Sequence, residues 1–148
     1  MLLFQPDHLA RMQRAAEADY PNECCGLIVG QIDEGGTDRI VTRIVPSPNV
    51  STSNLRDSFE VDPKVRFDLM RELEGGDDDI IGHYHSHPDH AAEPSETDRS
   101  MVYEPDLLWV IMSVEQSRVV DTQAFRVLTD PITFSPVEIR SPSLDHSS

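Results

Sequence analysis

The sequence has little positive charge and almost no lysine. Its 148 residues hold 12 Lys and Arg against 27 Asp and Glu, a formal net charge of −15. Nucleic acids and anionic membranes bind clustered cations, so neither is a predicted partner. Salt screens the repulsion within such an acidic surface, so a salt-rich cytoplasm is a hypothesis. Equal stability at 50 mM and 2 M salt, on the scale where screening acts, would contradict it.

The sequence also lacks a long apolar run. No stretch approaches the ~20 apolar residues that span a bilayer. The N-terminus, MLLFQPDHLARMQ, has neither the basic start nor the long apolar segment of a secretory signal. We therefore expect a cytoplasmic protein that does not enter the membrane.

Cysteine is scarce as well: Cys24 and Cys25 are adjacent and no others occur. A disulfide between neighbouring residues is strained, and the spacing is not the C-x-x-C of zinc or redox sites. Two free thiols suit a reducing cytoplasm, and we expect both to be buried at a strand edge.

The patterns that are present predict one α/β domain over residues 1–140, with a disordered tail at 141–148. Helical spacing occurs over 5–20 and after Asp62-Pro63, where the inward residues are expected to be Val65, Leu69, Met70 and Leu73. A short helix is expected from residue 96. Strand patterns cover residues 25–32, 39–45, 58–61, 77–85, 107–114, 119–128 and 132–139. This order predicts a mixed β-sheet flanked by helices.

Histidine is concentrated in one window, GHYHSHPDHAAEPSETD (82–98), which holds four of the six histidines. Side chains alternate faces along a strand, so His83, His85 and His87 share one face. Two imidazoles placed this way can converge on one metal ion where the strand ends, and Pro88 supports an end there. Asp98 is the candidate third ligand, because the loop 88–95 can return over the strand end.

These residues resemble the JAMM motif of the MPN metallopeptidase family. That motif joins an upstream glutamate to H-x-H, ten residues and an aspartate, with a serine three residues before it. His85-Ser86-His87-Pro88 and Ser95-Glu96-Thr97-Asp98 match, with ten residues between His87 and Asp98. Glu23, before the first long strand, occupies the glutamate's place. The resemblance covers most of the chain and implies an α/β fold similar to the cytidine deaminases, with one catalytic Zn²⁺ per chain.

The resemblance also implies roles for five residues. His85, His87 and Asp98 are similar to the zinc ligands, Glu23 to the general base, and Ser95 to the serine that stabilises the oxyanion. Two neutral imidazoles and one carboxylate leave zinc an open fourth position, where the pKa of water falls toward ~7. Glu23 can then take a proton and return it to the leaving amine. The Ser95 hydroxyl can share the developing negative charge.

Each residue also has a simpler interpretation. Ser95-Glu96-Thr97-Asp98 is a helix capping box, and Glu23 alone reads as a solvated acid. His83 is expected to be buried and hydrogen-bonded rather than a ligand, and His90 to be exposed in the loop. Asn49 resembles a polar position of the family's loop near the site, but it also suits an ordinary turn.

The resemblance implies a zinc metallopeptidase or isopeptidase that cuts after the Gly-Gly end of a ubiquitin-like sulfur carrier protein. The carrier tail would add to a sheet edge, and only glycine lets its backbone pass close to the metal. The main alternative is a non-catalytic MPN scaffold that binds proteins. A zinc deaminase needs H-x-E and P-C-x-x-C, which are absent here. A thiol enzyme using Cys24 is a further alternative. The carrier's identity and the oligomeric state stay open.

Overall fold

The computed structural model of the chain describes residues 1–141. The predicted tail, apart from its first residue, lies outside the described residues, as does His146. The elements in chain order are β1 (Leu2–Leu3), α1 (Pro6–Asp19), β2 (Cys25–Ile32), β3 (Arg39–Ser47), α2 (Pro63–Leu73), β4 (Asp79–Pro88), α3 (Glu96–Ser100), β5 (Leu108–Glu115), β6 (Arg118–Leu128), β7 (Thr133–Val137) and β8 (Ile139–Arg140).

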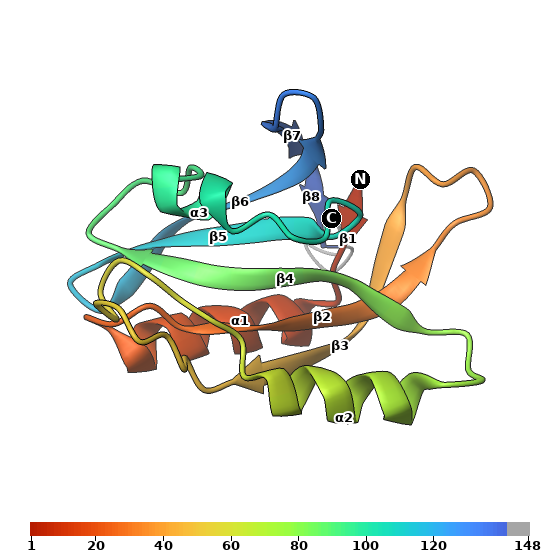
Figure 1. The fold of residues 1–148 in the computed structure, drawn as a ribbon, viewed down its shortest axis with the longest axis horizontal. Helices are drawn as coiled ribbons and strands as arrows, with labels where there is room; N and C mark the ends of the chain where they lie inside the picture. The colour runs from red at the N-terminus through yellow and green to blue at the C-terminus, as the bar shows by residue number, and fades with distance from the viewer. Residues whose placement is uncertain (142–148) are drawn as a thin grey trace, which may run out of the picture.

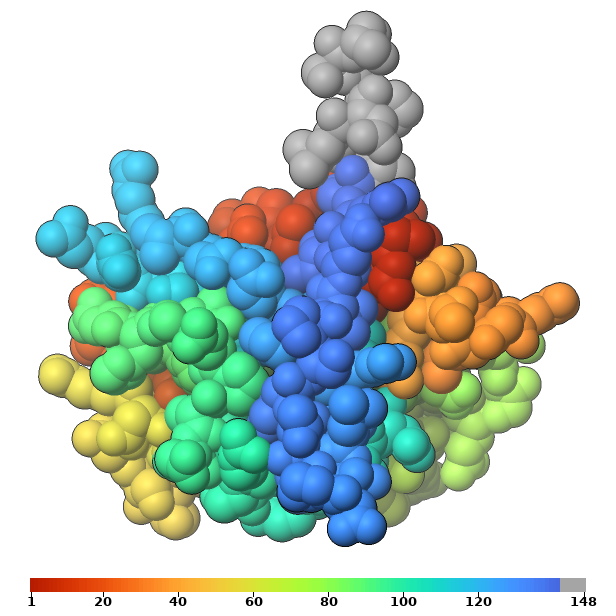
Figure 2. All heavy atoms as spheres, turned by 90° about the horizontal axis from the view of Figure 1, so that it is seen from above, coloured from red at the N-terminus to blue at the C-terminus, as the bar shows by residue number. Residues whose placement is uncertain are grey.

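The strands form one mixed sheet of eight, in the order β7-β6-β5-β4-β2-β3-β1-β8. β4 lies near its centre, parallel to β5 and antiparallel to β2. A single residue separates β7 from β8 in the chain, yet these strands stand at opposite ends of the order. The sheet therefore curls until its two ends meet, and the Leu2 N–H donates to the Glu138 carbonyl at 2.8 Å there. In the space-filling view the C-terminal strands cross the middle of the face in blue (Figure 2).

Helices cover both faces of the sheet, which confirms the predicted α/β class (Figure 1). α1 inserts Met12 and Ala16 into a cluster with Tyr84 and Val110, on one face. On the other face, α2, α3 and the loop 48–62 cover His83, His85 and His87 of β4, together with Trp109 of β5. Within residues 1–141, no helix is long and apolar enough to cross a membrane.

Two details of the predicted elements are wrong. Residues 58–61 form no strand; the segment runs through the loop, where Val61 makes a lone bridge to Asn49. Met70 does not face inward but is 55% exposed, whereas Leu69 is buried. α2 covers only a narrow strip of the sheet, so the row Val65, Leu69 and Leu73 is enough to fill the contact.

Candidate active site

The site lies on β4 and is positioned by the register of the central strands. His85 pairs with Cys25 of β2 and with Ile111 of β5, which fixes its place in the sheet. His87 follows two residues later on the same face, one residue before the end of the strand at Pro88. Both rings are buried, with His85 completely inaccessible to solvent.

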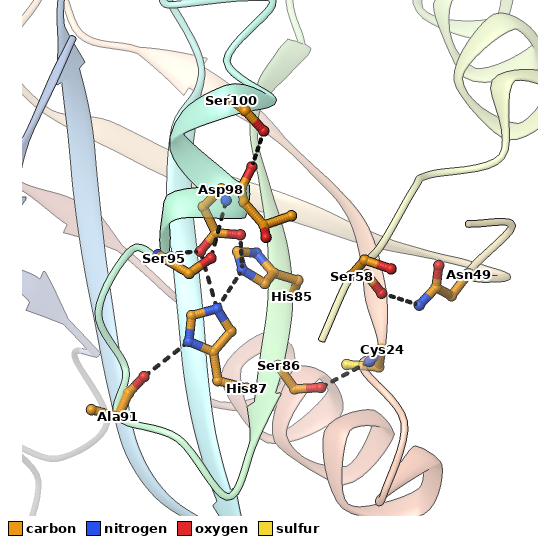
Figure 3. A network of polar contacts seen from close by, with 11 residues as sticks. Cys24, Asn49, Ser58, His85, Ser86, His87, Ala91, Ser95, Asp98 and Ser100 are labelled. Carbon is orange, nitrogen blue, oxygen red and sulfur yellow. Dashed lines mark hydrogen bonds and ion pairs between the residues drawn. The ribbon is translucent and has the colours of Figure 1, made fainter. Parts of the chain in front are cut away.

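Three potential ligand side chains converge, as the sequence predicted (Figure 3). The Nε2 atoms of His85 and His87 lie 3.1 Å apart. Asp98 Oδ1 is 3.2 Å from His85 Nε2, and Asp98 Oδ2 is 3.0 Å from His87 Nε2. Ligands held at 2.0–2.1 Å in a tetrahedron are separated from one another by about 3.3 Å. The three side chains are thus spaced for a zinc-sized cation.

The hydrogen bonding of His87 argues for a cation between these groups. His87 Nδ1 lies 2.9 Å from the Ala91 carbonyl oxygen, which can only accept, so this nitrogen carries the hydrogen. In the neutral ring, Nε2 is then a lone pair facing a carboxylate oxygen. Two acceptors at 3.0 Å repel one another unless a proton or a metal ion lies between them. The donor set of two imidazoles and one carboxylate suits zinc.

The electrostatics of the cluster agree with this reading. Burial lowers the pKa of His87, but its contacts with Asp98 and the Ala91 carbonyl outweigh that effect and raise the pKa overall. Burial also raises the pKa of Asp98, yet the two histidines and the Ser95 N–H hold that pKa well below its usual range. Asp98 is therefore an anion throughout the neutral range, ready to bind a cation.

Packing holds the His85 ring in addition to the polar contacts of its Nε2 with Asp98 and His87. Its ring stacks on Phe59 with centroids 4.2 Å apart and an angle of 15°, and Trp109 meets it edge-on at 5.6 Å. Its Nδ1 is buried without a hydrogen-bond partner among the described residues. Burial lowers the pKa of His85, so the ring is neutral and able to bind a metal. Sequence reasoning did not identify Phe59, which lies in a segment assigned to a strand.

Ser95 and Asp98 form the capping box of α3, and this does not conflict with a role in the site. The Ser95 N–H donates to Asp98 Oδ2 at 2.9 Å, and the Asp98 N–H donates to Ser95 Oγ at 3.0 Å. Ser95 Oγ is thus an acceptor in the cap, which leaves its own hydrogen available. The cap fixes the Asp98 carboxylate beside the two histidines.

Glu23 faces the same centre from the start of β2. One carboxylate oxygen of Glu23 and one nitrogen each from His85 and His87 all lie within 4.8 Å of one another. Glu23 is only 4% exposed, and its Oε1 is buried without a hydrogen-bond partner in the described part of the chain. Burial, followed by the charges of Asp98 and Asp57, raises the pKa of Glu23 to about 9. The simpler interpretation of Glu23 as a solvated acid is therefore wrong.

The position of Glu23 depends on residues outside the motif. Its N–H donates to the Leu55 carbonyl at 2.7 Å, and its carbonyl accepts from Asn49 Nδ2 at 3.1 Å. Asn49 makes three further bonds, so it ties the loop together and is more than a turn residue. Ser86 Oγ accepts from the Cys24 N–H at 2.8 Å, which attaches the Glu23 segment to β4 between the two histidines.

The predictions for the two cysteines and for His90 are confirmed, and the prediction for His83 is partly wrong. Cys24 and Cys25 are free and buried, as predicted, and burial raises the pKa of each thiol to about 12. His90 is exposed in its loop, as predicted. His83 is buried, but the hydrogen bond expected for it is absent: within residues 1–141 its Nδ1 has no partner.

A cavity of about 360 Å³ opens beside the cluster. Glu23, His87 and Ser95 line it together with the loop residues Ala91 and Pro94. We call it the catalytic cavity. It places a carboxylate with an unpartnered oxygen and a hydroxyl beside a potential metal centre, an arrangement suited to the hydrolysis of an acyl bond.

Known proteins are similar to this chain in sequence. The chain is 34% identical over 105 residues to a desampylase from Haloferax volcanii, covering 71% of this chain and 72% of that protein. It is 28% identical over 139 residues to a CysO-cysteine peptidase from Mycobacterium tuberculosis, covering 94% and 91%.

Solved structures agree on the fold. A protein from Desulfitobacterium hafniense has a TM-score of 0.78 at 27% identity, covering 95% of this chain and 94% of that one. A JAB1/MPN domain protein from Archaeoglobus fulgidus has a TM-score of 0.59 at 17% identity, covering 94% and 98%. The family model of the prokaryotic homologs of the JAB domain matches residues 5–127. The chain therefore belongs to the prokaryotic JAB-domain family.

Proposed function

We propose that this protein is a zinc-dependent peptidase that hydrolyses the bond after the Gly-Gly end of a ubiquitin-like sulfur carrier protein. The observation that carries the proposal is Glu23 Oε1, which is buried and has no partner among residues 1–141, beside the His85 and His87 nitrogens. A buried carboxyl group without a partner costs free energy. In a hydrolytic site, water and a metal ion would supply the missing partners.

His85, His87 and Asp98 would hold the zinc ion. When bound, zinc would act as a Lewis acid that acidifies water and polarises the scissile carbonyl. The ligand atoms come from a rigid central strand and a capped helix, so they lie close together before any metal binds. A preorganised set of ligands strengthens metal binding and fixes its geometry.

With zinc bound, the nearby cation would favour the ionised form of Glu23, which would accept a proton from water in the catalytic cavity and pass it to the leaving amine. Nothing else competes for its Oε1 among residues 1–141. Ser95, whose hydroxyl hydrogen is not used in the helix cap, would donate to the developing oxyanion. One donor of this kind contributes about 3 kcal/mol to barrier lowering.

The relatives and the geometry of the site support the proposed substrate class. Two relatives are named as a desampylase and a CysO-cysteine peptidase. The metal centre is deeply buried, and only glycine lets a backbone approach so closely. Because the thiols of Cys24 and Cys25 are free and buried, we also propose a cytoplasmic location.

Cleavage of a purified carrier tests the proposal. A carrier extended by several residues beyond Gly-Gly is incubated with zinc-loaded protein, and the products are weighed by mass spectrometry. We expect one cut after the second glycine, abolished by a chelator and by Glu23→Gln. Glu34→Gln, which removes an exposed carboxylate in the β2–β3 turn, is the matched control. If every carrier in a panel stays intact, the substrate assignment is contradicted.

A scaffold that binds proteins without cutting them is the second candidate. Measuring zinc in the purified protein separates the two, since a scaffold needs no stoichiometric metal. A thiol enzyme is disfavoured, because burial raises the pKa of Cys24 and Cys25 to about 12 and leaves no thiolate near neutral pH.

A further inference from the structure

A second cavity lies on the same face of the sheet, beside the proposed metal centre. Its volume is about 380 Å³. Phe59, Met101 and Trp109 supply apolar walls, His83 lines the interior, and the Arg66–Glu104 ion pair lies at its edge. We call it the aromatic cavity. Its residues come from the loop before α2, from α2 itself, from β4 and β5, and from the segment between α3 and β5.

His83 is the unexplained residue of this cavity. Its Nδ1 is buried without a partner, and neither ring nitrogen is hydrogen-bonded within the part of the chain that the structure describes. Trp109 meets the ring edge-on at 4.4 Å and Phe59 lies at 5.9 Å, so packing holds it in place. A buried polar group without a partner costs about 1–3 kcal/mol. Nε2 also lacks a partner among these residues but is not among the fully buried atoms, so it is the nitrogen that a polar group on a ligand in the cavity can reach.

The aromatic cavity and the catalytic cavity lie on either side of the metal ligands. Phe59 and Trp109 contact the rings of both His83 and His85, so they form a wall shared by the aromatic cavity and the metal site. His87 lines the catalytic cavity instead. Along β4 the order is therefore aromatic cavity at His83, metal ligands at His85 and His87, and catalytic cavity beyond.

Glu23 decides which part of a substrate enters each cavity. The leaving amine must lie near Glu23, which lines the catalytic cavity and not the aromatic one. The acyl part of the substrate must then extend the other way, toward His83. His83 is two residues from His85, about 7 Å along the strand. An extended chain covers that distance in two residues, so both glycines are passed before a side chain reaches the cavity.

We propose that His83 selects the residue immediately before the Gly-Gly of the substrate tail by a hydrogen bond inside the aromatic cavity. This inference rests on the proposed function. The cavity would take a side chain with an apolar body and a polar end, such as threonine or tyrosine. The apolar part contacts Phe59, Met101 and Trp109, and the hydroxyl bonds to the His83 ring. His83 is thus a specificity residue, distinct from the residues that carry the chemistry.

Matched substrates test the proposal. Substrates that carry Thr-Gly-Gly or Val-Gly-Gly before the scissile bond, each extended by the same residues beyond it, differ by one hydroxyl at constant shape, as do the matching Tyr-Gly-Gly and Phe-Gly-Gly substrates. We expect the wild type to prefer the hydroxyl member of one pair by about 10-fold in kcat/KM, the value of one hydrogen bond. His83→Phe keeps an aromatic ring but has no nitrogen, and it should lose this preference. His83→Asn restores a polar group and should recover part of it.

A binding measurement keeps the inference separate from the peptidase activity. The ring ¹⁵N resonances of His83 are recorded in zinc-loaded Glu23→Gln protein, with and without each tail peptide. Hydroxyl-bearing peptides should shift these resonances more than their apolar partners, even if the wild type cleaves nothing. Shifts without cleavage would uphold the inference and overturn the proposed function. No preference in the wild type, an equal preference in His83→Phe, or equal shifts within both pairs would overturn the inference.

Discussion

Replacing Glu23 by glutamine should stabilise the metal-free protein while it abolishes cleavage. Burial and two neighbouring acids raise the pKa of Glu23 from 4.5 to about 9. A raised carboxyl pKa means that the folded protein keeps a proton that the unfolded chain releases. Folding stability therefore falls as the pH rises from 4.5 toward 9. Glutamine imitates the protonated carboxyl and has no proton to lose.

The magnitude follows from the pH interval. Each pH unit between the two pKa values changes the free energy of unfolding by about 1.4 kcal/mol. At pH 8, three and a half units above 4.5, the raised pKa corresponds to an upper value of about 5 kcal/mol. Relaxation and water entry lessen the penalty of a buried charge, so we expect a gain of about 2 kcal/mol for Glu23→Gln. At pH 5 the gain should be below about 1 kcal/mol.

Urea denaturation in the presence of a chelator, at pH 5 and pH 8, measures the effect. Glu34→Gln controls for the loss of one negative charge and should change the free energy of unfolding by less than about 0.5 kcal/mol. Bound zinc should reduce the stability that Glu23→Gln gains over the wild type, because a nearby cation stabilises the ionised carboxylate. If Glu23→Gln destabilises the protein, or if its gain does not grow between pH 5 and pH 8, the reasoning from burial is refuted.

Three further predictions concern other parts of the site. Cys24 and Cys25 should resist thiol reagents at pH 8 until urea unfolds the chain, because burial raises their pKa to about 12; rapid labelling of the folded protein would contradict this. Asn49→Ala breaks four hydrogen bonds around the Glu23 segment and should cost about 2–3 kcal/mol in urea denaturation, with a lower kcat; an unchanged midpoint would refute its role as an anchor. Asp98→Asn should lower zinc affinity at least 100-fold by calorimetry, on the scale of lost metal contacts, whereas near-normal binding would exclude Asp98 as a ligand.

The sequence predicted the local parts of the site well because they depend on short-range periodicity. Alternation along one strand places His85 and His87 on a common face. A capping box brings Ser95 and Asp98 together within four residues, and this contact forms as predicted. The helix boundaries likewise follow from Pro6, Asp62 and Gly75-Gly76, whose conformational preferences are local.

The tertiary structure decided what no local pattern contains. Glu23 reaches the histidines because β2 pairs with β4 in a register that sets Cys25 opposite His85, and such pairing depends on contacts far apart in the chain. The loop 48–62 places Phe59 on His85 and Asn49 under Glu23, although its sequence reads only as polar turns and a short strand. Only the folded arrangement, in which β4, β5 and that loop enclose one cavity, leaves the His83 ring without a hydrogen-bond partner among the described residues. Strand spacing says which face a side chain occupies, whereas long-range packing determines what it meets there.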